Sequence, residues 1–154
     1  MTETFDPLKL ENQLCFPLYV CAKEMIRRYK PFLDELDLTY TQYIVMMALW
    51  EHQPLSVKQL GKLLFLDSGT LTPVIKSLEK KGYVVRERSH DDERVVNISL
   101  SDEGENLRVQ ALSIPEKIGR CIDLPIDEAE KLYSILHRLS GKLTEKDQAN
   151  GDSL

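Results

Sequence analysis

Residues 56–82 read Ser56-Val-Lys-Gln-Leu-Gly-Lys-Leu-Leu-Phe-Leu-Asp-Ser-Gly-Thr-Leu-Thr-Pro-Val-Ile-Lys-Ser-Leu-Glu-Lys-Lys-Gly82, and this stretch decides the fold of the chain. It predicts a short helix over 57–64 capped by Ser56, a tight turn, and a second helix over 69–81 capped by Asp67 or Ser68. Gly82 suits the left-handed position that often follows a helix end. The second helix carries small polar residues on its leading edge, which is the shape needed to lay a helix in the major groove of DNA.

Two short strands should follow this helix pair. Residues 84–88 and 95–100 alternate apolar and polar side chains, as expected for a two-stranded ribbon with one buried face. The run His90-Asp91-Asp92-Glu93 would form the polar turn between them. A further helix over 39–51, capped by Thr39, should precede the pair. Together these elements predict a winged helix-turn-helix over 39–100.

The chain before this region should be mostly one helix. Apolar residues recur at helical spacing over 11–36. The regular helix should begin close to Cys15 and Pro17, or kink there, because proline is tolerated in a first turn but not in a helix interior. Pro31 should kink or interrupt the helix near its end.

The chain after the ribbon should be helical as well. Ser101 can cap a long helix that runs towards Cys121, with Pro115 bending it. A last amphipathic helix is predicted over 127–143, and the polar segment 144–154 should be frayed.

The helices at the two ends carry wide apolar faces around a compact middle. Packing against a second copy of the chain is the simplest way to bury them. We therefore expect a single domain, 1–154, mainly α with a small β-wing, in which 11–36 and 102–145 are dimerisation helices. A dimer would also place two recognition helices in successive major grooves, about 34 Å apart.

Composition and charge fit a DNA-binding protein better than a membrane or metal protein. The 154 residues carry a net charge of -5, but residues 56–88 hold seven basic and three acidic residues, a local balance of +4. No apolar run is long enough for a membrane span and the N-terminus lacks a signal peptide, so we expect a cytoplasmic protein. The three cysteines and three histidines show no metal-ligand spacing, so neither metal nor cofactor is expected.

Two patterns carry a resemblance to a known family. The helix pair ends in Leu78-Glu-Lys-Lys-Gly-Tyr-Val84, and Asp92-Glu-Arg94 precedes Leu100-Ser-Asp-Glu-Gly104. Together they resemble the MarR family of dimeric winged helix-turn-helix regulators, whose wing carries Asp-x-Arg and whose next helix opens with Leu-Thr/Ser-x-x-Gly. The resemblance covers residues 10 to 145.

Further segments are similar to the OhrR branch, the organic-hydroperoxide-sensing repressors. They are Glu11-Asn-Gln-Leu-Cys15-Phe with Tyr19, Tyr29-Lys-Pro31, Leu38-Thr-Tyr40-Thr-Gln-Tyr43, and Leu66-Asp-Ser-Gly-Thr-Leu-Thr-Pro73. The resemblance implies that Cys15 is the peroxide sensor and that Tyr29 and Tyr40 approach it from the partner subunit. It also implies that Cys121 is the second cysteine of a two-cysteine subclass, which forms a disulfide with the sensor across the dimer. Pro17 departs from the pattern, because a helix-forming residue is expected there.

Sensing requires Cys15 to react as a thiolate. A helix start and tyrosine hydroxyls, with Tyr19 as a third candidate, would favour the anion. Attack on a peroxide gives a sulfenic acid, which a second thiol converts to a disulfide. An apolar surround would favour organic hydroperoxides over hydrogen peroxide; its candidate members are Phe16, Leu18, Ile26 and Met47. The alternative is that Cys15 is a small buried hydrophobic residue.

The partner of Cys15 in a disulfide is left open by the residues themselves. Cys21 lies six residues on, about 9 Å along a helix axis, which is too far for a disulfide without unwinding. We interpret Cys21 as structural or incidental. The resemblance implies that Cys121 is the resolving thiol, while the residues themselves leave Cys121, Cys21 and a small thiol open. The alternative for Cys121 is a packed thiol near a helix end.

Candidate DNA contacts lie on the second helix and the wing. Arg94 at the wing tip suits insertion into a narrow minor groove, with Asp92 orienting it, and Arg86 suits a phosphate contact. The alternative for Asp92 and Arg94 is an exposed ion pair of little energetic worth. Small hydroxyls and a lysine on the helix can reach bases or phosphates: Ser68, Thr70, Thr72 and Lys76.

These features predict a homodimeric repressor that binds a pseudo-palindromic DNA operator when reduced and releases it when organic hydroperoxides oxidise Cys15. One alternative is a MarR-type regulator released by a phenolic or lipophilic ligand. The other is an enzyme, a thiol peroxidase, which we disfavour because no general base or oxyanion arginine is evident near Cys15 and because the wing would have no role. The sequence specifies neither the operator nor the regulated genes.

Overall fold

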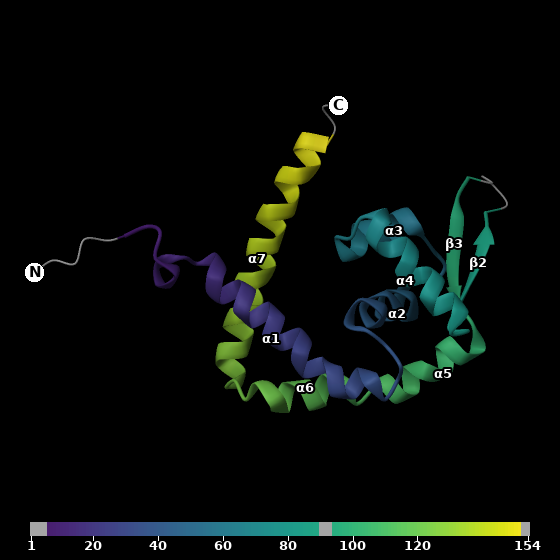
Figure 1. Cartoon of the computed structure of the whole chain (residues 1–154), viewed down its shortest axis with the longest axis horizontal. Coiled ribbons are helices and arrows are strands. Elements are labelled where there is room, and N and C mark those ends of the chain that lie inside the picture. The colour runs from purple at the N-terminus through teal and green to yellow at the C-terminus, as the bar shows by residue number, and fades with distance from the viewer. Residues whose placement is uncertain (1–5, 90–93, 152–154) are drawn as a thin grey trace, which may run out of the picture. The chain divides into compact units, whose positions relative to one another are not determined.

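The structure is a computed structural model that describes residues 6–89 and 94–151, with side chains described as far as residue 144. The chain forms two compact units, Met1–Pro115 and Glu116–Leu154. The elements follow in this order (Figure 1): η1 Leu10–Asn12, α1 Cys15–Asp34, α2 Tyr40–His52, β1 Leu55–Ser56, α3 Val57–Leu64, α4 Ser68–Lys80, β2 Val84–Arg88, β3 Val96–Leu100, α5 Asp102–Ala111, α6 Ile114–Ile122 and α7 Ile126–Gly151.

Helix α1 begins at Cys15, as the prolines of this segment predict. Pro17 falls in the first turn, where its missing N–H is one of the amides that lack a helical partner anyway. Pro31 lies inside the helix, which nonetheless continues to Asp34, so the predicted interruption at Pro31 is wrong. Within α1 only Leu33 is buried, and several large apolar side chains of the helix are exposed.

Side-chain caps begin the three helices of the central domain, by which we mean the winged helix-turn-helix formed by α2, α3, α4 and the wing. Thr39 caps α2 and Ser56 caps α3, each in a capping box that a glutamine three residues later completes. Asp67 caps α4, which runs one residue ahead of the predicted 69–81 at both ends. Because these signals are local in sequence, the expected helix starts are confirmed.

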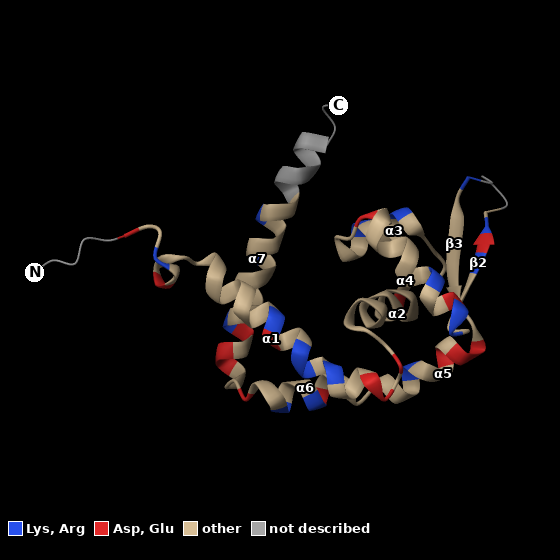
Figure 2. Cartoon of the chain, in the orientation of Figure 1, with Lys and Arg blue, Asp and Glu red and all other residues tan. Residues whose placement is uncertain are grey.

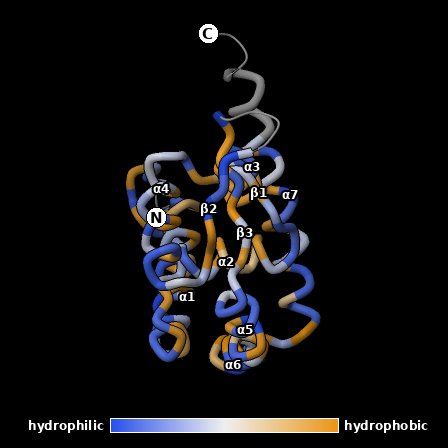
Figure 3. Tube along the Cα trace, turned by 90° about the vertical axis from the view of Figure 1, so that its right-hand side faces the viewer, coloured by the Kyte–Doolittle hydropathy of each residue, from blue (hydrophilic) through white to orange (hydrophobic). Residues whose placement is uncertain are grey.

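The core of the first unit forms where α2, α3 and α4 pack beside the hairpin of β2 and β3 (Figure 1). Hydrophobic stretches of α2, β2 and β3 lie together in the middle of the view in Figure 3. The side chains with no more than 1% exposure come from α2, α3, α4 and β3 and include Val45, Met46, Leu49, Leu60, Leu71, Ile75, Leu78 and Ile98. Their burial fixes the position of α4, whose opposite face stays exposed.

The wing is antiparallel, as predicted. Val84 pairs with Leu100 and Arg88 with Val96. Gly82 precedes the hairpin with φ of 80°, which confirms the left-handed position after α4. A third strand, β1, pairs with β3 and gives the order β1-β3-β2. With only two residues, β1 has no alternation that the sequence could reveal. The predicted turn at 90–93 lies outside the described residues.

Two expectations for the C-terminal helices are wrong. The long helix predicted from 102 to 121 is two helices, α5 and α6, and Pro115 lies at the start of α6 rather than bending one helix. The segment after 143, expected to fray, continues α7 to Gly151. That segment contains good helix formers but is polar all round, so it shows no apolar stripe. Among the described residues, no helix is long and apolar enough to cross a membrane.

Candidate functional site

The thiol of Cys15 lies at the first residue of α1 and is exposed. A side chain at this place is close to the free amides of the first turn, which favour negative charge. Tyr19 lies one turn further along the same face and is 61% exposed. The alternative interpretation of Cys15 as a buried packing residue therefore does not hold within a single chain. Cys21 and Cys121 are exposed as well, and Cys121 belongs to α6 in the second unit.

Two of the three predicted supporting tyrosines, Tyr29 and Tyr40, form a cluster with Tyr43 where α1 meets α2, and Tyr19 is not part of it. The ring centroids of Tyr29 and Tyr40 are 5.0 Å apart in an edge-on arrangement, and those of Tyr29 and Tyr43 are 5.9 Å apart. Burial raises the pKa of Tyr29 above its ordinary value of 10.0, and the neighbouring Tyr40 adds to the rise. The pKa of Tyr43 is raised by burial first and then by Tyr29 and Tyr40. These hydroxyls therefore stay protonated, and able to donate hydrogen bonds, beyond the ordinary range.

The raised pKa of Tyr29 predicts a loss of stability in alkali. The folded chain holds this proton more tightly than the unfolded chain, so the stabilisation is full below the unfolded pKa of 10.0 and is lost as pH rises through the raised value. Thermal unfolding between about pH 9 and pH 11 should show a shallower fall for Tyr29→Phe than for the wild type. Tyr133→Phe, which alters an exposed tyrosine of α7, is the control. Parallel curves for Tyr29→Phe and the wild type would contradict this.

One chain cannot bring its own Cys15 to this tyrosine cluster. Cys15 and Tyr29 lie on the same helix, fourteen residues apart, which corresponds to about 21 Å along the axis at 1.5 Å per residue. A hydrogen bond spans about 3 Å. If the thiol and the tyrosines act together, the tyrosines must come from a second chain.

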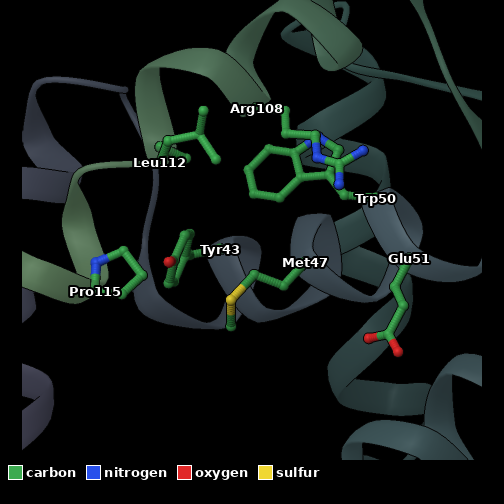
Figure 4. A pocket seen from close by; sticks show the side chains of 8 residues that line it. Tyr43, Met47, Trp50, Glu51, Arg108, Leu112 and Pro115 are labelled. Atoms are coloured by element: carbon green, nitrogen blue, oxygen red, sulfur yellow. The ribbon is translucent and has the colours of Figure 1, made fainter.

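An open groove adjoins the tyrosine cluster (Figure 4). Its volume is about 360 Å³. Tyr43, Met47 and Trp50 reach it from α2, and Leu112 and Pro115 line it from the chain that follows α5. Met47, a predicted member of the apolar surround of Cys15, is 39% exposed here. The groove can therefore take up an apolar group, either a side chain from another chain or a small molecule.

The predicted DNA-contact residues of α4 are all exposed: Ser68, Thr70, Thr72 and Lys76. Two of them are hydrogen-bonded within the helix. Thr70 donates its backbone N–H and its hydroxyl to Asp67, at 2.8 and 2.9 Å, and the Thr72 hydroxyl donates to the Ser68 carbonyl at 2.7 Å. The bonds from Thr70 hold the pKa of Asp67 below its ordinary value. At the start of α4, the hydroxyls of Thr70 and Thr72 therefore donate to oxygen atoms of the chain itself.

The basic residues of the wing differ in their surroundings. Arg86 on β2 is half-buried and lies 3.5 Å from the Glu79 carboxylate of α4, so it connects the wing to that helix. Its Nε is buried without a hydrogen-bond partner. Arg94 is exposed, and Asp92 lies outside the described residues. Figure 2 shows basic residues along α3, α4 and the wing, consistent with the positive balance expected there.

Gln42 was not among the residues that the sequence singled out. It is the buried polar side chain of the described residues, with 5% exposure. Its amide nitrogen donates to the Ser77 hydroxyl of α4 at 3.0 Å. The spacing Thr39-x-x-Gln42 reveals the capping box, but nothing local reveals a contact across 35 residues. No cluster that could hold a metal ion occurs among the residues that the structure describes.

Residues 27–110 match the protein family described as Transcriptional regulator SarA/Rot. The chain belongs to this family of winged-helix regulators. The match spans the end of α1, all elements from α2 to the wing and most of α5, so it covers the elements that place α4 and the tyrosine cluster.

Two curated relatives extend the similarity to almost the whole regulator. The chain is 46% identical to the organic hydroperoxide resistance transcriptional regulator of Bacillus subtilis, over 95% of this chain and 99% of the relative. It is also 46% identical to the HTH-type transcriptional regulator SarZ of Staphylococcus saprophyticus, over 86% of this chain and 91% of SarZ. The resemblance to the organic-hydroperoxide branch is thereby confirmed.

Solved structures of AbfR confirm the fold. Reduced AbfR bound to DNA shares 37% identity with the regulator at a TM-score of 0.71, over 88% of this chain and 94% of AbfR. AbfR from Staphylococcus epidermidis gives the same TM-score at 35% identity, over 88% of this chain and 94% of AbfR. The expected mainly α fold with a β-wing, of MarR type, is therefore confirmed.

Proposed function

We propose that this regulator is a homodimeric repressor that binds a pseudo-palindromic operator when reduced and releases it when an organic hydroperoxide oxidises Cys15. Cys121 of the second copy is the resolving thiol. The observation that carries the proposal is the placement of Cys15, an exposed thiol at the start of a helix whose apolar face has no cover within its unit. The similarity to a regulator of organic hydroperoxide resistance supports the choice of signal.

The exposed face of α1 supports the dimer. Large apolar side chains along it are 36–73% exposed: Leu14, Phe16, Tyr19, Val20, Met25 and Ile26. An uncovered apolar stripe of this length is typical of a surface that another chain buries. The same arrangement completes the sensor, because a second chain is needed to bring Tyr29 and Tyr40 to Cys15.

The central domain supports binding to DNA. Helix α4 is held by its buried face and presents its exposed face beside the basic wing, which is the arrangement that reads a major groove and contacts the flanking backbone. Within the same branch, AbfR was solved bound to DNA in its reduced form. Two such domains in a dimer would grip two half-sites at a fixed spacing.

The chemistry of the switch is a two-electron oxidation. The Cys15 thiolate attacks one peroxide oxygen, the O–O bond breaks, and the alcohol leaves after taking up a proton, so Cys15 becomes a sulfenic acid. The Cys121 thiol of the second copy then attacks that sulfur, an S–S bond forms and water leaves. Since both cysteines lie in the predicted dimerisation helices, this bond would rearrange the dimer and alter the spacing of the two α4 helices.

An operator-binding experiment tests the proposal. Reduced protein should shift a DNA fragment from its own promoter region in a gel assay, and stoichiometric cumene hydroperoxide should abolish the shift until a dithiol restores it. Operator binding that is equally tight before and after complete oxidation of the thiols would overturn the proposal.

The choice of Cys121 predicts a specific covalent dimer. After treatment with hydroperoxide, a denaturing gel without reductant should show a band at twice the chain mass for the wild type and for Cys21→Ser. The band should be absent for Cys121→Ser, whose Cys15 sulfenic acid lacks the proposed resolving thiol. A covalent dimer that persists in Cys121→Ser but disappears in Cys21→Ser would assign the resolving role to Cys21 instead.

The groove lined by Tyr43, Met47 and Trp50 supports a second candidate function, regulation by a small ligand. At about 360 Å³ it falls within the range of small-molecule sites. A regulator of this fold could be released by a phenolic or lipophilic ligand that binds there. Release of the operator by such a ligand from a variant that lacks Cys15 would favour this reading over thiol oxidation.

A further inference from the structure

A buried hydrogen-bond network joins the end of α4 to the corner between α1 and α2. Gln42 is at its centre: its Oε1 accepts from the Thr39 N–H at 2.9 Å, and its Nε2 donates to the Ser77 hydroxyl at 3.0 Å. The ammonium of Lys81 lies 3.3 Å from the same Oε1. One glutamine thus serves the cap of α2 and the last turns of α4 together.

Lys81 makes a second connection between the end of α4 and the corner between α1 and α2. Its ammonium donates to the backbone carbonyl of Asp37 and lies 3.2 Å from the Asp37 carboxylate. Asp37 has φ of 51°, in the left-handed region, so the chain makes its tight reversal at the residue that Lys81 holds. The corner and the end of α4 are therefore connected through a side-chain amide, a hydroxyl and an ammonium.

The tyrosine pair of the sensor adjoins this corner. Tyr40 is the first residue of α2 and follows Thr39 directly, and its ring contacts Tyr29 at 5.0 Å. Any displacement of Tyr40 must therefore move the residues that Gln42 holds. A buried amide that loses its partners is left without water to replace them, so the corner and the end of α4 resist separation.

We propose that Gln42 is the positioning residue that transfers a displacement of the Tyr29–Tyr40 pair to helix α4. This inference rests on the proposed function, because it requires that the tyrosines respond to the state of Cys15 and that α4 contacts the operator. Gln42 touches neither the thiol nor the DNA face of α4. Its role is to make the first turn of α2 and the last turns of α4 move as one body.

The test measures how strongly oxidation of the protein weakens operator binding, rather than operator binding alone. The quantity is the operator Kd of the hydroperoxide-treated protein divided by that of the reduced protein, obtained by fluorescence anisotropy at fixed salt. Gln42→Leu keeps the size of the side chain but removes its three hydrogen bonds, and the ratio should fall about tenfold. The rate at which Cys15 is oxidised should be unchanged, because none of the three hydrogen bonds involves Cys15, Tyr29 or Tyr40.

Two further variants keep the test decisive if Gln42→Leu folds poorly. Ser77→Ala cuts only the bond to α4 and leaves the cap of α2 intact, so the ratio should fall about fivefold. Gln42→Glu should restore the wild-type ratio, because a carboxylate can accept from the Thr39 N–H, from Lys81 and from the Ser77 hydroxyl, which rotates to donate.

Gln59→Leu is the matched control. Gln59 completes the capping box of Ser56 with the same geometry, at 2.8 and 3.2 Å, but on α3. It should lower the melting temperature and leave the ratio unchanged. The positioning role of Gln42 is wrong if Ser77→Ala and Gln42→Leu retain the wild-type ratio, or if Gln59→Leu reduces the ratio as much as Gln42→Leu does. The proposed function would stand in either case. If the wild-type ratio is itself one, the proposed function has failed.

Discussion

Replacing Cys15 by serine is expected to abolish the response of this regulator to organic hydroperoxides. A serine hydroxyl is not deprotonated near neutral pH and does not reduce a peroxide, so the variant cannot form the sulfenic acid that starts the switch. Cumene hydroperoxide should weaken operator binding by the wild type on the order of 100-fold, and binding by Cys15→Ser by less than about twofold. Reduced wild type and reduced Cys15→Ser should bind the operator alike.

Cys21→Ser controls for a general effect of removing an exposed thiol from α1. Both cysteines lie on the same helix and both are exposed, but only Cys15 lies at the helix start. Cys21→Ser should respond as the wild type does. Intact mass spectrometry should show one added oxygen, or loss of two hydrogens in the disulfide, in every responding protein. Release of the operator from Cys15→Ser by hydroperoxide would remove the sensor role from this residue.

Replacing Gly104 by alanine is expected to cause a large loss of stability. A Cβ atom at this position would lie 2.1 Å from the carbonyl oxygen of Tyr83 and 3.1 Å from its carbonyl carbon. Both are backbone atoms, so no rotamer change can relieve the overlap, and α5 must move away from the start of the wing. That movement would strain the hydrogen bond from Ser101 N–H to the Tyr83 carbonyl and the bond from Trp50 Nε1 to the Gly104 carbonyl, at 2.9 Å.

The expected cost is about 3 kcal/mol, as for overpacking that backbone shifts cannot fully absorb. At this chain length it corresponds to a fall of roughly 10 °C in the melting temperature, measured by circular dichroism. Gly119→Ala is the matched control, since a Cβ at Gly119 in α6 meets nothing within 4 Å. It should melt at the wild-type temperature or slightly above, because alanine favours a helix. A Gly104→Ala variant that melts within about 2 °C of the wild type would contradict the close-approach argument.

Structural features that depend only on neighbouring residues in the sequence were predictable. The caps at Thr39, Ser56 and Asp67 each depend on a side chain within three residues of the amide that it accepts from, so they are visible in the sequence. The left-handed Gly82 and the exposed face of α4 follow from the same local rules. The position of Cys15 at a helix start was also foreseeable, because Pro17 restricts where the regular helix can begin.

Features that depend on distant contacts were not predictable. Apolar spacing continues across residues 112 and 113, so the break between α5 and α6 left no sign in the periodicity. The contact of Gln42 with Ser77 joins positions 35 residues apart. The ion pair of Arg86 with Glu79, which connects the wing to α4, depends on how these two elements pack, and the prediction of Arg86 as a phosphate contact stays a prediction. The proposed pairing of Cys15 with Cys121 depends on a second chain, which spacing within one chain does not encode.

The internal hydrogen bonds of Thr70 and Thr72 constrain which base pairs α4 can distinguish. Both hydroxyl protons are directed at oxygen atoms of the chain itself, so what remains for a duplex is lone pairs and methyl groups. Such a surface complements the amino groups of adenine and cytosine and the methyl group of thymine. The two threonines offer no proton to the two acceptors of guanine, so Ser68 and Lys76 are the predicted contacts of α4 that could supply one. Opposite these threonines, an A·T pair presents both an amino group and a methyl group that they complement, and a G·C pair presents an amino group alone.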